Sequence, residues 1–304
     1  MSARILDGAQ VARQIRAEVA VGVKELQQRA GRPPGLTVIQ VGEDRASVVY
    51  IRNKARAAEK TGIRSSVIRL PETSTAAQVL ATVQHLNQDA ETDGILVQLP
   101  LPHGMASDEI LEAIDPDKDV DGFHPHNVGR LALGRPGFVP CTPAGIMELL
   151  RRNDIPLEGR HAVVLGRSNI VGKPMVQLLL AAHATVTVCH SRTRDLAAVA
   201  RGADILVAAV GRKGMVTEEF VRPGAVVVDV GIHPVEDEDE VRDLFGDSPR
   251  LEKFREKGTT LVGDVHPRRV RDVAGWLSPV PGGVGPLTVA LLLRNTLQAA
   301  QQRT

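Results

Sequence analysis

Short β-branched runs alternate with helical patterns along the chain, and this alternation limits the fold more than any other feature. In the second half the runs are HAVVLG, ATVTVCH, ADILVAAVG and GAVVVDVG, with the helical segments KPMVQLLLAAH and RDLAAVARG between the first three. The first half alternates in the same way, as in GLTVIQVG and DGILVQLPLP. Strands that alternate with helices predict a mostly parallel sheet covered by helices. We therefore expect an α/β fold.

The stretch GRLALGRPGFVPCTPAG is rich in Gly and Pro and is the best candidate for a crossing between two domains. A chain of 304 residues suits two domains. We expect residues 1–140 to form an N-terminal α/β domain and residues 141–280 to form a Rossmann-type doubly wound domain, the type that binds dinucleotides. The last segment, residues 281–304, contains one more helix, which we expect to return to the first domain.

The charge balance and the cysteines exclude several classes of protein. Lys and Arg number 37 against 36 Asp and Glu, so no basic excess favours nucleic acid or a membrane surface. Cys141 and Cys189 lie far apart and lack metal-ligand spacing, which predicts no metal site and a reduced, cytoplasmic setting. The N-terminal MSARILDGAQ has no apolar core of a signal peptide, and no apolar run is long enough to span a bilayer. The acidic run EDEDE (236–240) is expected to be a solvated loop.

The segment VVLGRSNIVGKP places a glycine turn between a strand and a helix. Gly166 and Gly172 are six positions apart, unlike the G-x-G-x-x-G spacing, so an ordinary strand-to-helix turn remains open as an alternative. The amino end of the following helix could hold a pyrophosphate on its free N–H groups. The next strand ends in CHSRT, with Ser191 and Arg192 where NAD-binding domains carry an acid. With Arg167 in the turn, these residues favour NADP.

The chain contains one tyrosine, Tyr50, in the helical segment SVVYIRNKARAAEKTG. Helical spacing places Ser47, Tyr50 and Lys54 on one stripe beside an apolar stripe that would face the core. The two side chains could line a ligand cleft. An amphipathic helix with a snorkelling lysine is the simpler alternative.

Two further loops carry candidate chemistry. In DPDKDVDGF the acids Asp117, Asp119 and Asp121 match the opening of an EF-hand loop, but its twelfth position is Val128 rather than a bidentate Glu. Calcium is therefore not expected, although an Asp of this loop could face a substrate. The glycines of SPVPGGVGP could let the backbone approach a ligand or could form a tight turn.

Taken together, these motifs resemble the methylenetetrahydrofolate dehydrogenase/cyclohydrolase family. Its signatures occur in the family's order over nearly the whole chain, as SVVYIRNK, DGILVQLPLP, KDVDGF, PCTPAG, GRSNIVGKP and PVPGGVGPLT. The chain departs from the family at HPRRV after GDV, where an acid and an aromatic are usual, and in residues 234–258, which are longer and more charged.

The resemblance implies an NADP-dependent enzyme that oxidises 5,10-methylenetetrahydrofolate and hydrolyses the 5,10-methenyl product to 10-formyltetrahydrofolate, and it suggests a homodimer. The first domain would then bind the folate. Lys54 would be the acid/base group in contact with Gln98, Tyr50 would orient the substrate, and Asp121 would hold the pterin. The loop residues expected at the substrate are Pro281, Gly282 and Gly283. The residues expected at NADP are Gly166, Arg167, Ser168, Ser191, Arg192 and Ile232.

Two other classes of protein fit the sequence less well. A short-chain dehydrogenase also uses Tyr and Lys four positions apart, but there the cofactor glycines precede the pair, whereas here Gly166 follows it. A catalytically silent folate- or nucleotide-binding protein is disfavoured because Tyr50, Lys54, Gln98 and Asp121 occur together.

Overall fold

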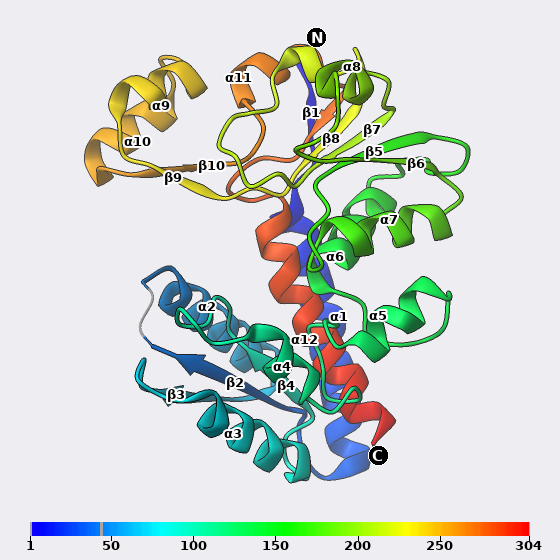
Figure 1. Ribbon diagram of the computed structural model, residues 1–304, viewed down its shortest axis with the longest axis vertical. Coiled ribbons are helices and arrows are strands. Elements are labelled where there is room, and N and C mark those ends of the chain that lie inside the picture. Colours follow the sequence, from blue (N-terminus) through cyan, green and yellow to red (C-terminus); the bar gives the residue numbers. More distant parts are fainter. Residues whose placement is uncertain (1, 43–44, 304) are drawn as a thin grey trace. The chain divides into compact units, whose positions relative to one another are not determined.

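The computed structural model describes residues 2–42 and 45–303, and for residues 45–49 it describes the backbone alone. The chain forms two compact units (Figure 1). Unit 1 comprises Met1–Val11 and Thr142–Leu287, and unit 2 comprises Ala12–Cys141 and Thr288–Thr304. These boundaries differ from the expected ones because residues 1–11 and 281–287 belong to unit 1. The final helix returns to the first half of the chain, as expected.

Unit 1 is built on a six-stranded parallel sheet in the order β1-β11-β8-β7-β5-β6. Its central strands are continuous apolar runs, as strands covered on both faces require. The strands are β1 (Arg4–Ile5), β5 (His161–Leu165), β6 (Thr185–Cys189), β7 (Ile205–Ala208), β8 (Val226–Asp229) and β11 (Trp276–Leu277). The chain reverses its direction of winding between β5 and β7, and ligands of doubly wound sheets bind outside the carboxyl ends of the strands at such a point.

Short helices connect the strands of unit 1, and apolar residues from both element types form its core. The helical elements are α6 (Cys141–Arg152), α7 (Gly172–Ala181), α8 (Leu196–Arg201), η1 (Glu218–Phe220) and α11 (Pro267–Val270). Strand β1 contains two residues, too few to recognise in the sequence, and its pairing with β11 explains why the N-terminus belongs to this unit.

Residues 233–262 form a separate element within unit 1. Strands β9 (His233–Val235) and β10 (Thr260–Val262) pair antiparallel, with helices α9 (Glu238–Phe245) and α10 (Pro249–Lys257) between them. The acidic run 236–240, which was expected to be a loop, is partly helical because α9 begins at Glu238. Its N-cap residue, Asp237, accepts a hydrogen bond from the Glu240 N–H. Acidic side chains stabilise the positive amino end of a helix, so the run has a structural use.

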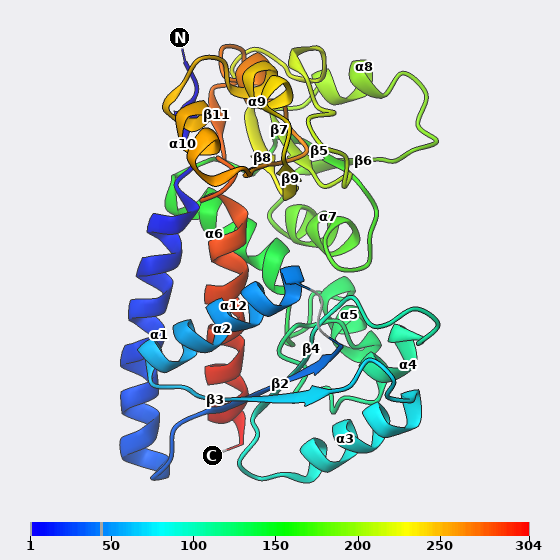
Figure 2. The same cartoon turned by 90° about the vertical axis from the view of Figure 1, so that its left-hand side faces the viewer.

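Unit 2 contains a three-stranded parallel sheet in the order β3-β2-β4, with the fully buried β2 in the centre. Helices α2 and α3 cover its opposite faces (Figures 1 and 2). Its strands are β2 (Gly35–Val41), β3 (Arg64–Leu70) and β4 (Gly94–Val97). Its helices are α1 (Gly8–Ala30), α2 (Arg45–Thr61), α3 (Ala76–Gln88), α4 (Ser107–Glu112), α5 (Pro125–Ala132) and α12 (Val284–Gln302). Across both units, no described helix is long and apolar enough to cross a membrane.

A buried ion pair closes the amino end of the unit 2 sheet. The Asp93 side chain is fully buried and accepts from both terminal nitrogens of Arg32, at 2.7 and 2.8 Å, and from the Gly35 N–H at 2.8 Å. Removing one partner of such a pair leaves the other charge buried without compensation.

We expect Asp93→Ala to lower the free energy of unfolding by about 3–5 kcal/mol, because it removes the buried acceptor of the Gly35 N–H and leaves Arg32 with a longer ion pair, to Glu91 at 3.8 Å. Urea denaturation followed by circular dichroism measures this loss. The control is Glu91→Ala, since Glu91 pairs with Arg64 at the surface with half of its side chain exposed, and its loss should stay below about 1 kcal/mol. Equal losses in both variants would contradict this account.

Candidate functional site

Lys54 and Gln98 meet in unit 2. Lys54 lies on α2 with 8% of the residue exposed, and its Nζ donates to Gln98 Oε1 at 3.0 Å. Gln98 directly follows β4, and its backbone N–H continues the ladder to Ile39. The Gln98 Nε2 donates to the Leu99 carbonyl at 2.7 Å, so the amide oxygen is the atom that faces Lys54. The expected contact between Lys54 and Gln98 is therefore present.

Tyr50 lies one turn before Lys54 on α2 and is 36% exposed. Burial raises the pKa of the Tyr50 phenol, so this group stays protonated through the neutral range. The ring can therefore contact a ligand, and its hydroxyl can donate a hydrogen bond. Ser47, expected on the same stripe, has a side chain outside the described part of the structure.

The acidic loop divides its two central carboxylates between different tasks. Asp119 is buried and accepts the N–H groups of Gly122, Phe123 and His124 at 2.8–3.2 Å, together with the Asn127 amide. Asp119 therefore holds the loop together. For Asp121, burial raises the pKa to about 6; the Lys54 charge opposes this shift, and the Asp119 charge adds to it. Asp121 is thus a carboxyl that gains and loses its proton near neutrality.

Cys141 and Asn295 complete this site, and sequence reasoning assigned no role to either. The Cys141 thiol lies 3.4 Å from the Val120 carbonyl and hydrogen-bonds to Asp121. Asn295 of α12 donates to the same carbonyl at 2.8 Å. Burial, together with the Asp121 charge, raises the pKa of Cys141, which keeps it a neutral thiol. Cys141 belongs to the motif PCTPAG, which could have drawn attention to it. The position of a single cysteine in the sequence does not reveal which groups its thiol contacts.

In unit 1 the glycine turn is a tight structure at the carboxyl end of β5. Gly166 has φ of +119°, and a Cβ there would lie 2.1 Å from the Ala209 carbonyl oxygen. A Cβ on Gly172 would lie 2.4 Å from the Gly166 oxygen. Ser168 Oγ accepts the N–H groups of Val171 and Gly172, both at 3.2 Å, and so organises the start of α7. Only glycine fits at both ends of this turn.

The basic residues expected at a 2′-phosphate lie on adjacent turns of the same sheet edge. Leu165 at the end of β5 pairs with Cys189 at the end of β6, so Arg167 and Ser191 follow neighbouring strand ends. Arg167, Ser191 and Arg192 are all exposed. Within the described part of the chain, neither arginine side chain is engaged in an ion pair. Two guanidinium groups that form no ion pair with a carboxylate are well suited to bind a phosphate through charge-assisted hydrogen bonds.

Two buried aspartates, which sequence reasoning did not identify, arrange the neighbouring loops. Asp264 accepts the N–H groups of Val210, Gly211 and Arg212 at 2.7–3.0 Å and lies 2.8 Å from His233 Nε2. Asp229 ends β8 and accepts three backbone N–H groups of the following loops, and burial raises its pKa to about 8. Ile232, expected at the cofactor, follows β8 and is 41% exposed.

These features fit a phosphorylated dinucleotide. The glycine turn meets the amino end of α7 and leaves no side chain at Gly166 or Gly172, where a pyrophosphate would approach. Arg192 follows β6, where the 2′ position of the ribose is expected, and Arg167 follows the adjacent strand β5.

The loop expected at the substrate also belongs to unit 1. Gly283 N–H donates to the Pro279 carbonyl at 2.7 Å, and the Ala9 N–H donates to the Gly282 carbonyl at 2.8 Å. Gly282 has φ of +107°, and Gly8 packs against the Gly283 carbonyl so closely that no Cβ fits between them. The structure thus groups Tyr50, Lys54, Gln98 and Asp121 in unit 2, and Pro281–Gly283 with the expected cofactor residues in unit 1.

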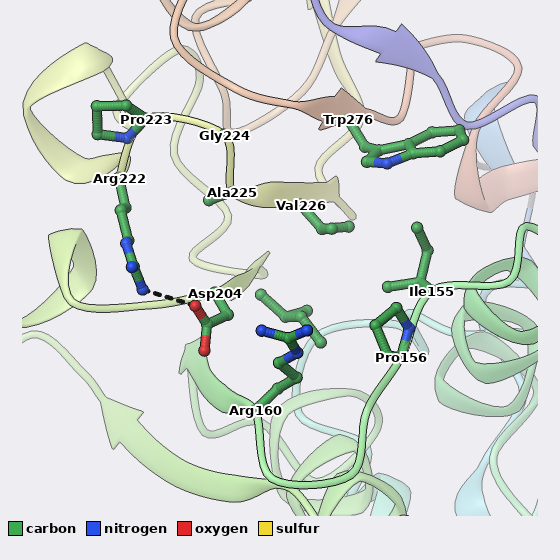
Figure 3. Close-up of a pocket in the computed structure, with 11 residues that line it drawn as sticks. Ile155, Pro156, Arg160, Asp204, Arg222, Pro223, Gly224, Ala225, Val226 and Trp276 are labelled. Atoms are coloured by element: carbon green, nitrogen blue, oxygen red, sulfur yellow. Dashed lines mark hydrogen bonds and ion pairs between the residues drawn. The ribbon is translucent and has the colours of Figure 1, made fainter.

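A cavity of about 290 Å³ lies at the amino ends of β5, β7 and β8, away from the carboxyl edge (Figure 3). None of the expected site residues lines it. Arg222 donates to Asp204 at 2.6 Å on its wall, and the other Asp204 oxygen accepts the His161 N–H at 3.0 Å. These contacts secure the starts of two strands, a structural role.

The fold is that of a two-unit dinucleotide-dependent enzyme. It combines a doubly wound sheet that has a glycine turn and exposed arginines at its carboxyl edge with a separate α/β unit that carries a buried lysine. The family comparisons agree with this class. Residues 6–121 match the catalytic domain of tetrahydrofolate dehydrogenase/cyclohydrolase, and residues 140–304 match its NAD(P)-binding domain. The chain therefore belongs to the tetrahydrofolate dehydrogenase/cyclohydrolase family, which confirms the resemblance and the expected fold class.

Individual relatives match over the full length. The bifunctional protein FolD of Koribacter versatilis is 56% identical over 304 residues, covering 100% of this chain and 98% of the relative. The crystal structure of FolD from Campylobacter jejuni has a TM-score of 0.90 and 43% identity, and covers both chains completely. The Trypanosoma brucei enzyme, solved with NADP cofactor and inhibitor, has a TM-score of 0.89 and 40% identity over 99% of this chain and 98% of its own.

The pKa of Asp121 predicts a specific pH dependence of stability. Its folded pKa of about 6 lies above the ordinary value of about 3.9, so its stabilising contribution is complete below pH about 4 and is lost as the pH rises through about 6. The difference in unfolding free energy between the native chain and Asp121→Asn should therefore fall by up to about 3 kcal/mol over this range. Urea titrations at several pH values measure it. A difference that is constant with pH would show that folding does not shift the pKa of Asp121.

Proposed function

We propose that the chain performs two successive reactions on one folate, with Lys54 as the group that moves the proton. It oxidises 5,10-methylenetetrahydrofolate to the 5,10-methenyl cation, and it hydrolyses this cation to 10-formyltetrahydrofolate. When bound, NADP⁺ accepts the hydride from the methylene carbon. The single observation that carries the proposal is the buried Lys54 held by Gln98 beside Asp121, in a chain of this family.

The cofactor would be held at the carboxyl edge of the unit 1 sheet. The turn of Gly166 and Ser168, with the amino end of α7, would bind the pyrophosphate through backbone N–H groups. Arg167, Ser191 and Arg192 would bind the 2′-phosphate through charge-assisted hydrogen bonds. Ile232, which is exposed beside these loops, would supply an apolar contact.

The folate would be recognised by a carboxylate, a ring and a glycine loop. Ionised Asp121 can accept from the amino and ring N–H groups of a pterin, a paired pattern that fixes the orientation of the ring. Tyr50 would orient the substrate through its ring. Pro281, Gly282 and Gly283 would let the backbone approach the substrate, since two of the three carry no side chain.

Hydrolysis is the step that needs proton transfer by the protein. Water adds its oxygen to the methenyl carbon and loses one proton, which leaves a neutral hydroxyl adduct. The ring nitrogen then gains a proton and its bond to that carbon breaks; the hydroxyl proton is released to solvent as the C=O bond forms, and the formyl group remains on the other nitrogen. Lys54 Nζ is the group proposed to take up the proton that water loses and return it to the ring nitrogen. Gln98 holds Nζ in place through a neutral amide and adds no charge.

We further propose a cytoplasmic homodimer. Both cysteines are buried and unpaired thiols, which suits a reducing compartment. Strand β6 is an edge of the six-stranded sheet, and its Val188 is 41% exposed, which supports association through that surface.

The function is tested with native chain and variants of the Lys54 site. Methylenetetrahydrofolate and NADP⁺ are supplied, and the absorbances of reduced cofactor and methenyl product are followed; absence of turnover would overturn the proposal. Lys54→Met, which keeps length and removes the amine, should lower cyclohydrolase activity by about 10²-fold or more and dehydrogenase activity far less. Tyr50→Phe, the control that keeps the ring, should affect both activities less. Full cyclohydrolase activity in a folded Lys54→Met variant would show that Lys54 is a packing residue and not the proton-transfer group.

Cofactor choice depends on the exposed arginines. Arg167→Ala should raise KM for NADP⁺ about tenfold or more, because a charge-assisted hydrogen bond contributes roughly 1.5–3 kcal/mol, and it should leave KM for NAD⁺ nearly unchanged. Steady-state kinetics with both cofactors measure the effect. Arg160→Ala is the matched control, since Arg160 is exposed at the opposite end of β5. An equal rise for NADP⁺ and NAD⁺ would show that Arg167 does not contact the 2′-phosphate.

A further inference from the structure

The α9–α10 element, residues 233–262, folds around a small core of its own. Its antiparallel strands and two helices bury an apolar cluster that consists of Val235, Val241, Leu244, Leu251, Phe254 and Val262. On its surface, Glu238 pairs with Arg242 at 3.0 Å and Arg255 at 2.6 Å. An element with its own core can hold a side chain in a fixed position against its neighbours.

One side chain of this element reaches out of it. Arg250 lies in the first turn of α10, and its Nε donates to Thr260 Oγ1 at 3.2 Å. The Arg250 Nη2 donates to the Leu261 carbonyl at 2.6 Å and also to the Val280 carbonyl. The ring of Phe245 covers the guanidinium group, with Cζ 4.2 Å from the ring centroid. One nitrogen therefore links β10 to the loop that precedes Pro281.

The arrangement is unusual for a cation because its protein acceptors are neutral. No described carboxylate forms an ion pair with Arg250, and burial lowers the pKa of its guanidinium group. Burying a charged group without a countercharge costs free energy, and an apolar side chain could fill the same space without that cost. The planar fork of arginine can bridge several acceptors in fixed directions, which an apolar side chain cannot do.

The loop of residues 279–283, which contains the Val280 carbonyl, is held by few other hydrogen bonds. Pro279 and Pro281 have no N–H, so neither can donate a backbone hydrogen bond. The turn is closed by Gly283 N–H to the Pro279 carbonyl, and the Gly282 carbonyl accepts from Ala9. The Val280 carbonyl points to Arg250, so the α9–α10 element sets the direction of the peptide next to Pro281.

We propose that Arg250 is a positioning residue for folate binding, and that the α9–α10 element is a brace for the backbone of residues 280–283. This inference rests on the proposed function in assigning Pro281–Gly283 to the folate. A brace of this kind acts on how well the loop is preorganised before substrate arrives. Its loss weakens folate binding and leaves the chemical step and the cofactor site largely intact.

The test combines hydrogen exchange without substrate and steady-state kinetics on Arg250→Met. We expect the Gly283 amide, which donates to the Pro279 carbonyl, and the Ala9 amide, which donates to the Gly282 carbonyl, to exchange about tenfold faster. KM for methylenetetrahydrofolate should rise about tenfold, the loss of one hydrogen bond to a charged group. Values of kcat and KM for NADP⁺ should stay within about twofold. Arg255→Met, on the same helix but paired at the surface with Glu238, should leave both readouts unchanged.

A second control separates a brace from general stability of the element. Val241→Ala weakens the α9–α10 core and keeps Arg250, so amides of α9 should exchange faster while the Gly283 and Ala9 amides keep their protection. If Val241→Ala exposes the loop as much as Arg250→Met does, or if Arg250→Met leaves the loop protected, the inference is overturned. Should Arg250→Met fail to fold, Arg250→Lys, which replaces the planar fork with one ammonium group, is judged by the same criteria. Absence of folate turnover in the native chain would overturn the proposed function, whereas loop exchange still decides the brace.

Discussion

Two buried carboxylates, Asp229 and Asp264, hold together the carboxyl end of the unit 1 sheet. Between them they accept N–H groups from the loops after β7, β8 and β10, at 2.7–3.1 Å. Their packing leaves no room for side chains, since a Cβ on Gly263 would lie 1.9 Å from Asp229 Oδ2. Parallel strands bring their loops to one edge, but a specific surface there also requires fixed loop backbones. These carboxylates fix them, and the turn at Gly166 packs against the same group of loops through Ala209.

Two buried carboxylates in unit 2 also hold chain segments together by accepting several hydrogen bonds. Asp93 accepts from Arg32 and from the Gly35 N–H at the start of β2, and Asp119 accepts from the N–H groups of the loop that follows it. The second case explains the calcium-like pattern DPDKDVDGF: the middle acid is fully engaged by its own loop. Asp121, two residues later, remains available for a ligand; its pKa is raised mainly by burial and also by the neighbouring Asp119 charge. The loop therefore places a structural carboxylate and the proposed folate-binding carboxylate two positions apart.

Much of the site was predictable from the sequence because its signals are local. Helical spacing places Tyr50 and Lys54 one turn apart, and a β-branched run that ends at Gln98 brings an amide to the end of a strand. The glycine turn and the acid-free end of β6 were likewise visible. The contributions of Asn295, Asp264 and Arg250 were not, because each acts on residues distant in the sequence: Asn295 reaches Val120, and Arg250 reaches Val280. The two-residue β1 was missed for the related reason that a strand so short has no periodicity.

A comparison of buried lysines explains why burial alone does not identify a catalytic group. Lys118 is 2% exposed, burial lowers its pKa, and its Nζ donates to the carbonyls of Leu86 and Asp89, both at 2.7 Å. Both acceptors are backbone atoms that cannot move away, so this ammonium group ties α3 to the chain that follows it. Lys54 donates instead to the side-chain amide of Gln98, which can rotate, and it lies beside Asp121, which titrates near neutrality. Proton transfer requires a group whose hydrogen bonds can be exchanged for those of a substrate. The nature of the partner, rather than the degree of burial, distinguishes Lys54 from Lys118.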